Sequence, residues 1–340
     1  MSGRSVLVAR LDSMGDVLLS GPAVRAVARG GREVVYLAGP RGADAAALLP
    51  GVDRVLTWCA PWIAADPPPV DAEDVARLVR RIAALDVAEA VVLTSFHQSP
   101  LPLALLLRMA GVPRVCATSE DYPGSLLDVR HRVGDGGPEA QRMVSLARAA
   151  GFPPSPEDRG LLAVRRPLPD TCRLTGPDGY AVVHVGADAP SREIPPALAA
   201  KTVAALAGHG HRVLVTGGAE ETGRAEEVAG PGGLSLAGRT TVAELADVLD
   251  RASVLVAGNT GPAHLAAAVG TPVVSLFSPV VPASAWAPHG PRVRVLGDQG
   301  EACAGTRARV CPVPGHPCLT SVTADEVLAA VEDLLEEGEE

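Results

Sequence analysis

Two short stretches of the chain place chemistry-bearing residues at a turn between an apolar run and a helix-like segment. One is RLDSMGD at residues 10–16, and the other is GNTGPAH at residues 258–264. Each follows a run with strand-like composition and precedes apolar residues at helical spacing. In a parallel sheet such turns meet at the carboxyl edge, where open α/β folds bind their ligands.

The second stretch has the composition of an anion-binding turn. Gly261 allows close backbone approach, Thr260 offers a hydroxyl, and His264 falls within the first helical turn. A helix start presents N–H groups and the positive end of a dipole, so a phosphate or diphosphate is the simplest ligand. An ordinary capped helix with a satisfied histidine explains the same residues equally well.

Asp16, at the end of the first stretch, is the candidate for acid–base chemistry. It starts a helix whose dipole lowers the proton affinity of a carboxylate, and Gly15 permits the tight turn before it. The stretch lacks the glycines of a dinucleotide fingerprint, and a carboxylate would repel a pyrophosphate. A carboxylate in a cleft, with a diphosphate bound across it, suits proton abstraction from a hydroxyl. The alternative is an acidic helix start with no further role.

Composition narrows the class of protein. The 340 residues suit two domains, and the formal charge of -9 without a basic block argues against a nucleic-acid partner. Only 3% of the residues are aromatic, which weakens any base-stacking surface. We see neither a signal-like segment nor the roughly 18 apolar residues of a membrane span, so we expect a soluble, cytoplasmic protein with at most peripheral membrane contact.

Strand-like and helix-like segments alternate along the chain, which predicts an α/β fold with doubly wound parallel sheets. Strands are expected at 5–9, 33–37, 54–57, 90–94, 114–117, 180–185, 211–216, 234–236, 253–257 and 273–277. Helices are expected at 17–28, 43–49, 71–85, 101–110, 196–208, 219–229, 242–250, 263–269 and 325–335.

A Pro-rich region at 153–179 interrupts the alternation and predicts two domains with a cleft between them. We expect an N-terminal domain over 1–165, a linker over 166–179, a C-terminal domain over 180–322, and a final helix with an acidic tail over 323–340.

Six cysteines are present, and Cys303, Cys311 and Cys318 cluster near the end of the chain. Without an export signal we expect thiols rather than disulfides. Together with His316 these residues could ligate a metal, but their spacing lacks the paired knuckles of structural zinc sites. A surface loop with part-buried thiols is the favoured interpretation, and we predict no metal site.

The two stretches in order carry a family resemblance. The segments VLVARLDSMGDVLLSGPAVRAV and GNTGPAHLAAAVGTPVVSLFSP, followed by Trp286, Pro288, Gly290 and a late HPCL, resemble glycosyltransferase family 9, the heptosyltransferases. The likeness covers nearly the whole chain. It implies a GT-B fold of two Rossmann-like domains facing each other across a cleft. It also implies inverting transfer without metal or cofactor, typically from ADP-heptose.

The resemblance also implies roles for particular residues. It puts the catalytic base on Asp16, in an acceptor-side loop, and the donor on the second domain, where Arg192 would replace a metal as the cation. The alternatives are an exposed loop arginine at 192, a normal acidic helix start at 220–221, and plain helix capping near 240. The implied acceptor-side residues are Ser13, Met14 and Gly15; the implied donor-binding residues are Arg192, Glu220 or Glu221, Thr240, Asn259, Thr260, Gly261, Pro262 and His264.

Two positions depart from the family pattern. Asn259 stands where the well-known heptosyltransferases have Asp, and no tryptophan follows the SREI segment that ends at Ile194. An amide keeps hydrogen bonds but loses a charge, so contacts to the donor sugar are expected to differ.

We therefore expect an inverting GT-B glycosyltransferase that moves a sugar, by resemblance a heptose, to a hydroxyl of a glycan, glycolipid or small molecule. One alternative is a GT-B sugar-nucleotide epimerase, which would turn over donor without an acceptor. Another is a nucleotide-sugar-binding protein that has lost catalysis. Acceptor contacts are expected from the loops at 58–69, 95–100 and 119–132.

Overall fold

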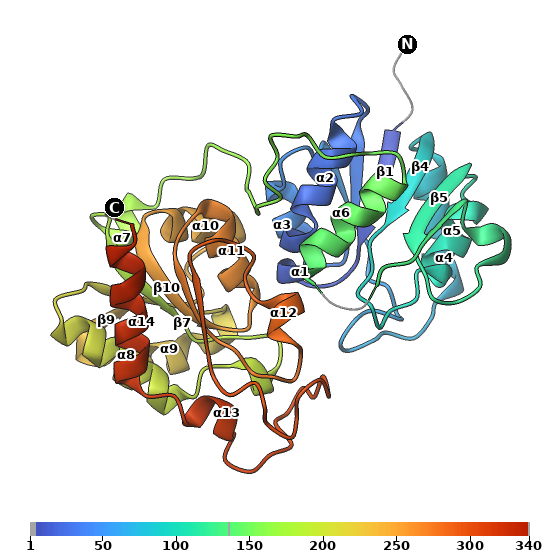
Figure 1. Ribbon diagram of the computed structural model, residues 1–340. Helices are drawn as coiled ribbons and strands as arrows, with labels where there is room; N and C mark the ends of the chain where they lie inside the picture. The colour runs from blue at the N-terminus through green and yellow to red at the C-terminus, as the bar shows by residue number, and fades with distance from the viewer. Residues whose placement is uncertain (1–4, 135–136, 339–340) are drawn as a thin grey trace. The chain divides into compact units, whose positions relative to one another are not determined.

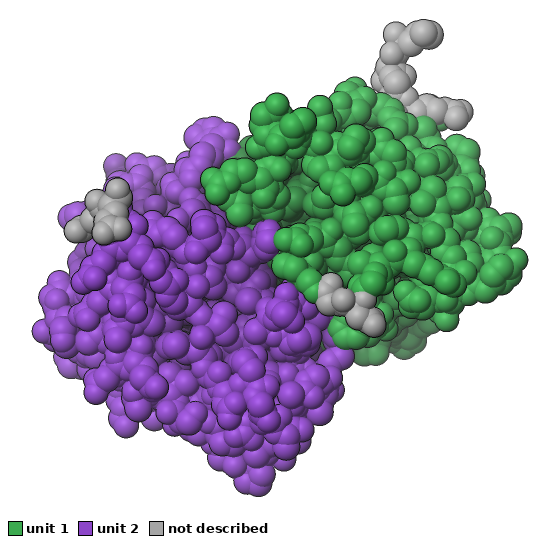
Figure 2. Space-filling model, in the orientation of Figure 1, with its two compact units in different colours: residues 1–165 green, residues 166–340 purple. Residues whose placement is uncertain are grey.

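The computed structural model describes residues 5–134 and 137–338, and the chain forms two compact units, Met1–Arg165 and Arg166–Glu340 (Figures 1 and 2). Each unit contains one six-stranded sheet in which all paired strands are parallel. The predicted α/β class with two doubly wound parallel sheets is confirmed.

The first unit has the strand order β3-β2-β1-β4-β5-β6. The chain moves outward from β1 in one direction and returns through β4 to build the other half, so the strand order switches between β1 and β4. Such a switch point leaves a crevice outside the carboxyl ends of the two strands. The strands are β1 Ser5–Arg10, β2 Val34–Ala38, β3 Arg54–Thr57, β4 Val87–Val92, β5 Arg114–Thr118 and β6 Val129–His131.

Helices of the first unit connect these strands. The prediction of a single helix over 17–28 is wrong, because the segment forms two helices that meet at Ser20. Pro22 lacks the N–H that would continue the first helix, and the Ser20 hydroxyl donates to the carbonyl of Val17 at 2.6 Å. The helices are α1 Met14–Leu19, α2 Gly21–Ala28, α3 Ala43–Leu48, α4 Ala72–Ala83, α5 Leu101–Met109 and α6 Glu139–Ala149. Strand β6 and helix α6 were not expected from the sequence.

The second unit repeats the pattern with the order β12-β11-β10-β7-β8-β9, and its switch point lies between β7 and β10. Its first residues, 166–179, include the short helix α7 Cys172–Thr175. The strands are β7 Tyr180–His184, β8 Val213–Thr216, β9 Gly233–Ser235, β10 Ala252–Gly258, β11 Val273–Leu276 and β12 Val293–Leu296. The edge strand β12 was not expected.

Helices α8 Pro196–Gly208 and α10 Val242–Asp250 have the expected bounds. The predicted start of the helix over 219–229 is wrong. A 3-10 turn over Ala219–Glu221 comes first, and α9 then runs over Thr222–Ala229. The remaining helices are α11 Gly261–Val269, α12 Ala283–Trp286, α13 Pro317–Thr320 and α14 Ala324–Glu336. The predicted acidic tail ends in residues 339–340, which lie outside the described residues. No helix in the described part of the chain is long and apolar enough to cross a membrane.

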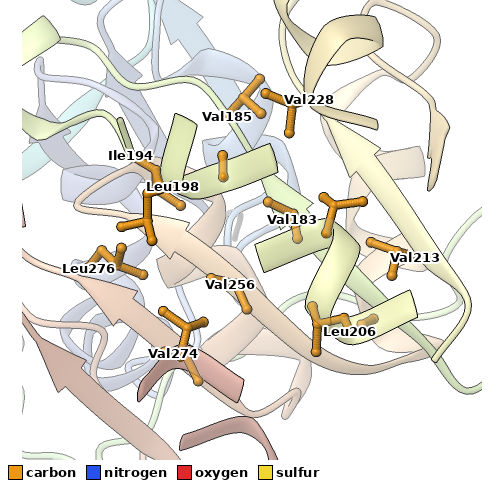
Figure 3. Packing of buried hydrophobic residues seen from close by; sticks show 14 of the residues in the cluster. Val183, Val185, Ile194, Leu198, Leu206, Val213, Val228, Val256, Val274 and Leu276 are labelled. Atoms are coloured by element: carbon orange, nitrogen blue, oxygen red, sulfur yellow. The ribbon is translucent and has the colours of Figure 1, made fainter. Parts of the chain in front are cut away.

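Aliphatic side chains of alternate strand positions form the core beside each sheet. In the second unit, Val183 and Val185 of β7 and its following loop lie in one cluster with Val256 of β10 and with Leu198 and Leu206 of α8 (Figure 3). This packing holds β7, β10 and α8 together beneath the loops of the switch point.

Truncating this core should destabilise the second unit. Leu206→Ala removes a fully buried side chain of α8, and such changes cost about 2–5 kcal/mol because a cavity remains. Leu234→Ala is the control, because Leu234 is 46% exposed and should cost far less. Urea unfolding followed by circular dichroism measures both variants, and equal losses would contradict the packing described.

Candidate active-site residues

The RLDSMGD loop lies at the switch point of the first unit. Arg10 is the last residue of β1, and residues 11–13 lead into α1. The loop after the neighbouring strand β4 contributes Ser95 and Gln98 to the same place. The strand order therefore brings together two loops that are far apart in the sequence.

A buried guanidinium is at the centre of this site. The Arg10 side chain is completely buried, and its Nη2 donates to Asp16 Oδ1 at 2.7 Å and to Ser95 Oγ at 2.8 Å. Its Nε lies 2.7 Å from Asp12 Oδ2. Burial disfavours the charged guanidinium, but Asp12 and Asp16 outweigh that effect and raise the pKa of Arg10. Arg10 is therefore a fixed positive charge that holds two carboxylates.

Asp12 is the more enclosed of the two carboxylates, with 13% of its side chain exposed. Gln98 Nε2 donates to Asp12 Oδ1, and the backbone N–H of Ser95 donates to Gln98 Oε1 at 3.1 Å. Burial raises the pKa of Asp12, Arg10 opposes this rise, and the charge of Asp16 adds to it.

Asp16 is fixed on both oxygens and yet reaches solvent. Oδ1 accepts from Arg10, Oδ2 accepts from the Ser13 hydroxyl at 3.2 Å, and 21% of the side chain is exposed. Met14 and Gly15 form the first turn of α1 just before Asp16. This arrangement suits a base, because the carboxylate is oriented and remains accessible to a hydroxyl.

A glycine outside both motifs sets the position of this loop. A Cβ at Gly39, directly after β2, would lie 2.2 Å from the carbonyl oxygen of Leu11. No side chain fits there, so only glycine lets the loop after β1 pack this closely. Sequence reasoning missed Gly39. It expected the 95–100 loop as an acceptor contact but not that Ser95 and Gln98 bond to Arg10 and Asp12, because nothing local to them points to residues 10–16.

The GNTGPAH turn lies at the switch point of the second unit, where β10 ends and α11 begins. Asn259, Thr260 and His264 are buried there. Thr260 is the N-cap residue of α11, yet its side chain makes no capping hydrogen bond. The helix start therefore keeps its positive dipole end and a hydroxyl together, as an anion site requires.

Asn259 is the unusual residue of this turn. It is 8% exposed, and its buried Nδ2 has no hydrogen-bond partner among the residues that the structure describes. A buried donor without an acceptor costs about 1–3 kcal/mol, so such a group calls for an explanation.

Arg192 is held beside this turn by backbone contacts. It ends a 3-10 turn over Pro190–Arg192, and a Cβ at Gly258 would lie 2.2 Å from the Arg192 carbonyl oxygen. The preceding Ser191 donates its N–H to the carbonyl of Arg309 at 3.0 Å and its hydroxyl to that of Ala308 at 2.6 Å. The loops after β7 and β10 thus meet at the switch point.

The two predicted acidic candidates differ in environment. Glu220 is exposed, whereas Glu221 is half-buried and accepts from the N–H of Gly218 at 2.6 Å. A Cβ at Gly186, after β7, would lie 2.1 Å from either carboxylate oxygen of Glu221. Of the pair, Glu221 is therefore the one that the structure brings to the switch point.

The Gly238–Thr240 loop approaches the same edge of the sheet. The N–H of Gly238 donates to the carbonyl of Gly217 at 3.0 Å, and Thr240 is half-buried. The next residue, Thr241, is the one that caps α10, through a reciprocal capping box with Glu244.

His184 ends β7 and pairs with Thr216, with 3.0 Å between Nδ1 and Oγ1. Burial lowers the pKa of His184 to about 4, so this histidine is neutral near pH 7. It therefore adds no positive charge to the site.

Cys303, Cys311 and Cys318 lie in one neighbourhood of the second unit. The Cys303 and Cys311 thiols are within hydrogen-bonding reach, and burial raises the pKa of Cys303 and, to about 11, that of Cys318. Within 5–134 and 137–338, no group of three or more His, Cys, Asp or Glu is arranged to hold a metal ion.

Comparison with known proteins decides the family. Residues 97–316, more than half of the chain, match the model of glycosyltransferase family 9 (heptosyltransferase). The chain belongs to this family. As a family 9 glycosyltransferase it is an enzyme, and the predicted family is confirmed. The match includes the predicted donor-binding residues, whereas the 10–16 loop precedes it. No curated protein sequence matches the chain.

Solved family 9 structures share the fold over nearly the whole length. E. coli ADP-heptose LPS heptosyltransferase II is 20% identical with a TM-score of 0.77, covering 99% of this chain and 100% of its own. A glycosyltransferase family 9 protein from Veillonella parvula is 15% identical with a TM-score of 0.77, covering 99% of each chain. E. coli heptosyltransferase WaaC, solved with ADP-2-deoxy-2-fluoro heptose, is 21% identical with a TM-score of 0.71, covering 97% of this chain and 99% of its own. The predicted GT-B fold is confirmed.

Adding one methyl group should disturb the loops of the second unit. Gly258→Ala would force Arg192 away from β10, and overpacking of this kind costs about 1–3 kcal/mol. Gly223→Ala, in the first turn of α9 with open space around it, should not destabilise. Urea unfolding of both variants tests this, and a Gly258→Ala protein as stable as the wild type would rule out the close approach.

Proposed function

We propose that this enzyme transfers a heptose from ADP-heptose to an acceptor hydroxyl, with inversion, with Asp16 as the general base and without a metal. Asp16 would take the proton from the hydroxyl as its oxygen attacks the anomeric carbon, while the nucleoside diphosphate leaves from the opposite side. The observation that carries this proposal is an oriented and still accessible carboxylate at a switch point.

The second unit offers the groups that a departing diphosphate needs. In this proposal, the start of α11, the Thr260 hydroxyl and Arg192 stabilise the negative charge of the departing diphosphate. All three lie at the switch point of the second unit. Gly261, Pro262 and His264 form the first turn of that helix, and Glu221 and the loop around Thr240 would contact the nucleoside. The structure of WaaC with an ADP-heptose analogue supports ADP-heptose as the donor class.

The acceptor is proposed only as a class: a hydroxyl of a glycan, glycolipid or small molecule. The loops at 58–69, 95–100 and 119–132, together with Ser13, Met14 and Gly15, would contact it. Among them, the 95–100 loop is joined to Asp12 through Gln98. The cytoplasmic location expected from the sequence remains part of this proposal.

Replacing Asp16 should impair catalysis and leave nucleotide binding unchanged. We expect ADP, without metal, to raise the thermal stability of the wild type and of Asp16→Asn alike, more than UDP, GDP or TDP does. Hydrolysis of ADP-heptose, in which water replaces the acceptor and ADP is released, should be at least a hundredfold slower in Asp16→Asn. Removal of a general base produces losses of this size. Asp44→Asn, an exposed acid of α3, is the matched control and should keep full activity.

Several results would contradict this proposal. Full turnover by Asp16→Asn would remove the base assignment, and stabilisation by UDP, GDP or TDP in place of ADP would change the donor class. Conversion of the donor to an isomer without ADP release would favour an epimerase.

Asn259 should strengthen donor binding although its buried amide lowers the stability of the free protein. Asn259→Leu removes the unpartnered amide, so the free energy of unfolding should stay equal or rise, whereas donor affinity should fall roughly 5- to 100-fold. Calorimetry with ADP and with ADP-heptose would show whether the amide contacts the nucleotide or the sugar.

The matched control is Thr271→Val, because the buried Thr271 hydroxyl donates to the carbonyl of Leu249 at 2.6 Å. That variant should lose stability and keep donor affinity. Unchanged affinity for both ligands in Asn259→Leu would show that the amide does not serve the donor.

A further inference from the structure

We propose that Asp12 is a positioning residue for the base: it shares the Arg10 guanidinium with Asp16 and limits how strongly that cation stabilises the ionised Asp16. This inference rests on the proposed function, because it concerns how well Asp16 accepts a proton. Asp12 itself would not receive the acceptor's proton.

The site contains a chemical conflict that a second carboxylate would relieve. An opposite charge at 2.7 Å orients Asp16, but a cation this close also favours the ionised form of a carboxyl over the protonated form. A carboxylate with such low proton affinity is a poor general base near neutral pH. The cation that positions Asp16 would therefore weaken it.

The geometry shows how Asp12 opposes this effect. Asp12 Oδ2 lies against Nε of Arg10 and Asp16 Oδ1 against Nη2, so the two carboxylates occupy neighbouring nitrogens of one guanidinium. One cation is divided between two anions, and the charge of Asp12 favours protonation of Asp16. Gln98 anchors Asp12 from the loop after β4, which keeps it from turning toward solvent.

The other ionisable groups around the pair do not replace Asp12. Glu139 on α6 adds negative charge, but it is paired with Arg142 of the same helix at 3.4 Å. Burial raises the pKa of Tyr36 on β2, so this phenol stays neutral, and its hydroxyl lies 2.7 Å from that of Ser20. Asp12 and Asp16 are the carboxylates that the structure places within 2.7 Å of the Arg10 guanidinium, so neutralising Asp12 would remove one of the negative charges beside that cation.

Accessibility separates the roles of the two carboxylates. Asp16 is the more exposed and is bound by Ser13, on the side of α1. Asp12 has one oxygen on Arg10 and the other on Gln98, so neither oxygen is left to approach an acceptor. Because the groups are coupled, the acid limb of the activity profile belongs to the pair and not to Asp16 alone.

The test is the pH profile of Asp12→Asn, with release of ADP from ADP-heptose as the readout. We expect the acid limb of kcat to move at least one pH unit lower than in the wild type. The plateau of kcat should fall roughly 3- to 10-fold, because a carboxylate that no longer shares the Arg10 cation is a weaker base. KM for the donor should not change, and Asp12→Glu, which restores the charge, should return the acid limb toward the wild-type position.

Each outcome decides the inference. An unmoved acid limb with reduced kcat would mean that Asp12 is merely structural, and complete loss of turnover in folded protein would make Asp12 itself essential to the chemistry. Both overturn the proposal. If Asp12→Asn fails to fold by circular dichroism, Asp12→Ser repeats the neutralisation with a smaller side chain. A wild type that releases no ADP from any sugar nucleotide would instead defeat the proposed function.

Discussion

The candidate site of the first unit depends on one buried cation. Arg10 has no exposed surface and is the last residue of β1, so its guanidinium must find its partners inside the protein. It finds them in Asp12 of the loop after β1, Asp16 of the first turn of α1, and Ser95 of the loop after β4. A buried charge costs several kcal/mol unless it is paired, and the two loops are therefore held together as long as the unit is folded.

The second unit reaches a comparable arrangement by different means. There, backbone packs on backbone: the carbonyl of Arg192 lies against Gly258, and Ser191 is hydrogen-bonded to the carbonyls of Ala308 and Arg309. At the same edge, Nδ2 of Asn259 has no hydrogen-bond partner among the residues that the structure describes. A site built to bind a polar ligand gains from that, because a satisfied amide would have to break a bond before making a new one.

The two units therefore divide two physical tasks. The first orients a carboxylate by electrostatics, and if that carboxylate is the base we propose, the charges around Arg10 must leave it able to accept a proton. The second presents helix N–H groups, a hydroxyl and an amide at a rigid sheet edge. Preorganised groups of this kind stabilise developing charge without having to rearrange.

Much of this protein was readable from its sequence. The alternation of apolar runs and helical spacing predicted both parallel sheets, and α8 and α10 were placed at their observed bounds. The turns at 10–16 and 258–264 were recognised as loops at a carboxyl edge, and their order along the chain indicated the family. These are local properties, because strand period, helix start and turn chemistry depend on residues a few positions apart.

Only the tertiary structure decided what these residues touch. That Arg10 is fully buried, that Gln98 reaches Asp12 from 86 residues away, and that Gly39 makes room for Leu11 all follow from the strand order. The same holds for the choice of Glu221 over Glu220, which depends on Gly186 after a neighbouring strand. No local pattern contains this information. Contacts across a sheet depend on which strands become neighbours and on where each strand ends, and both are properties of the whole fold.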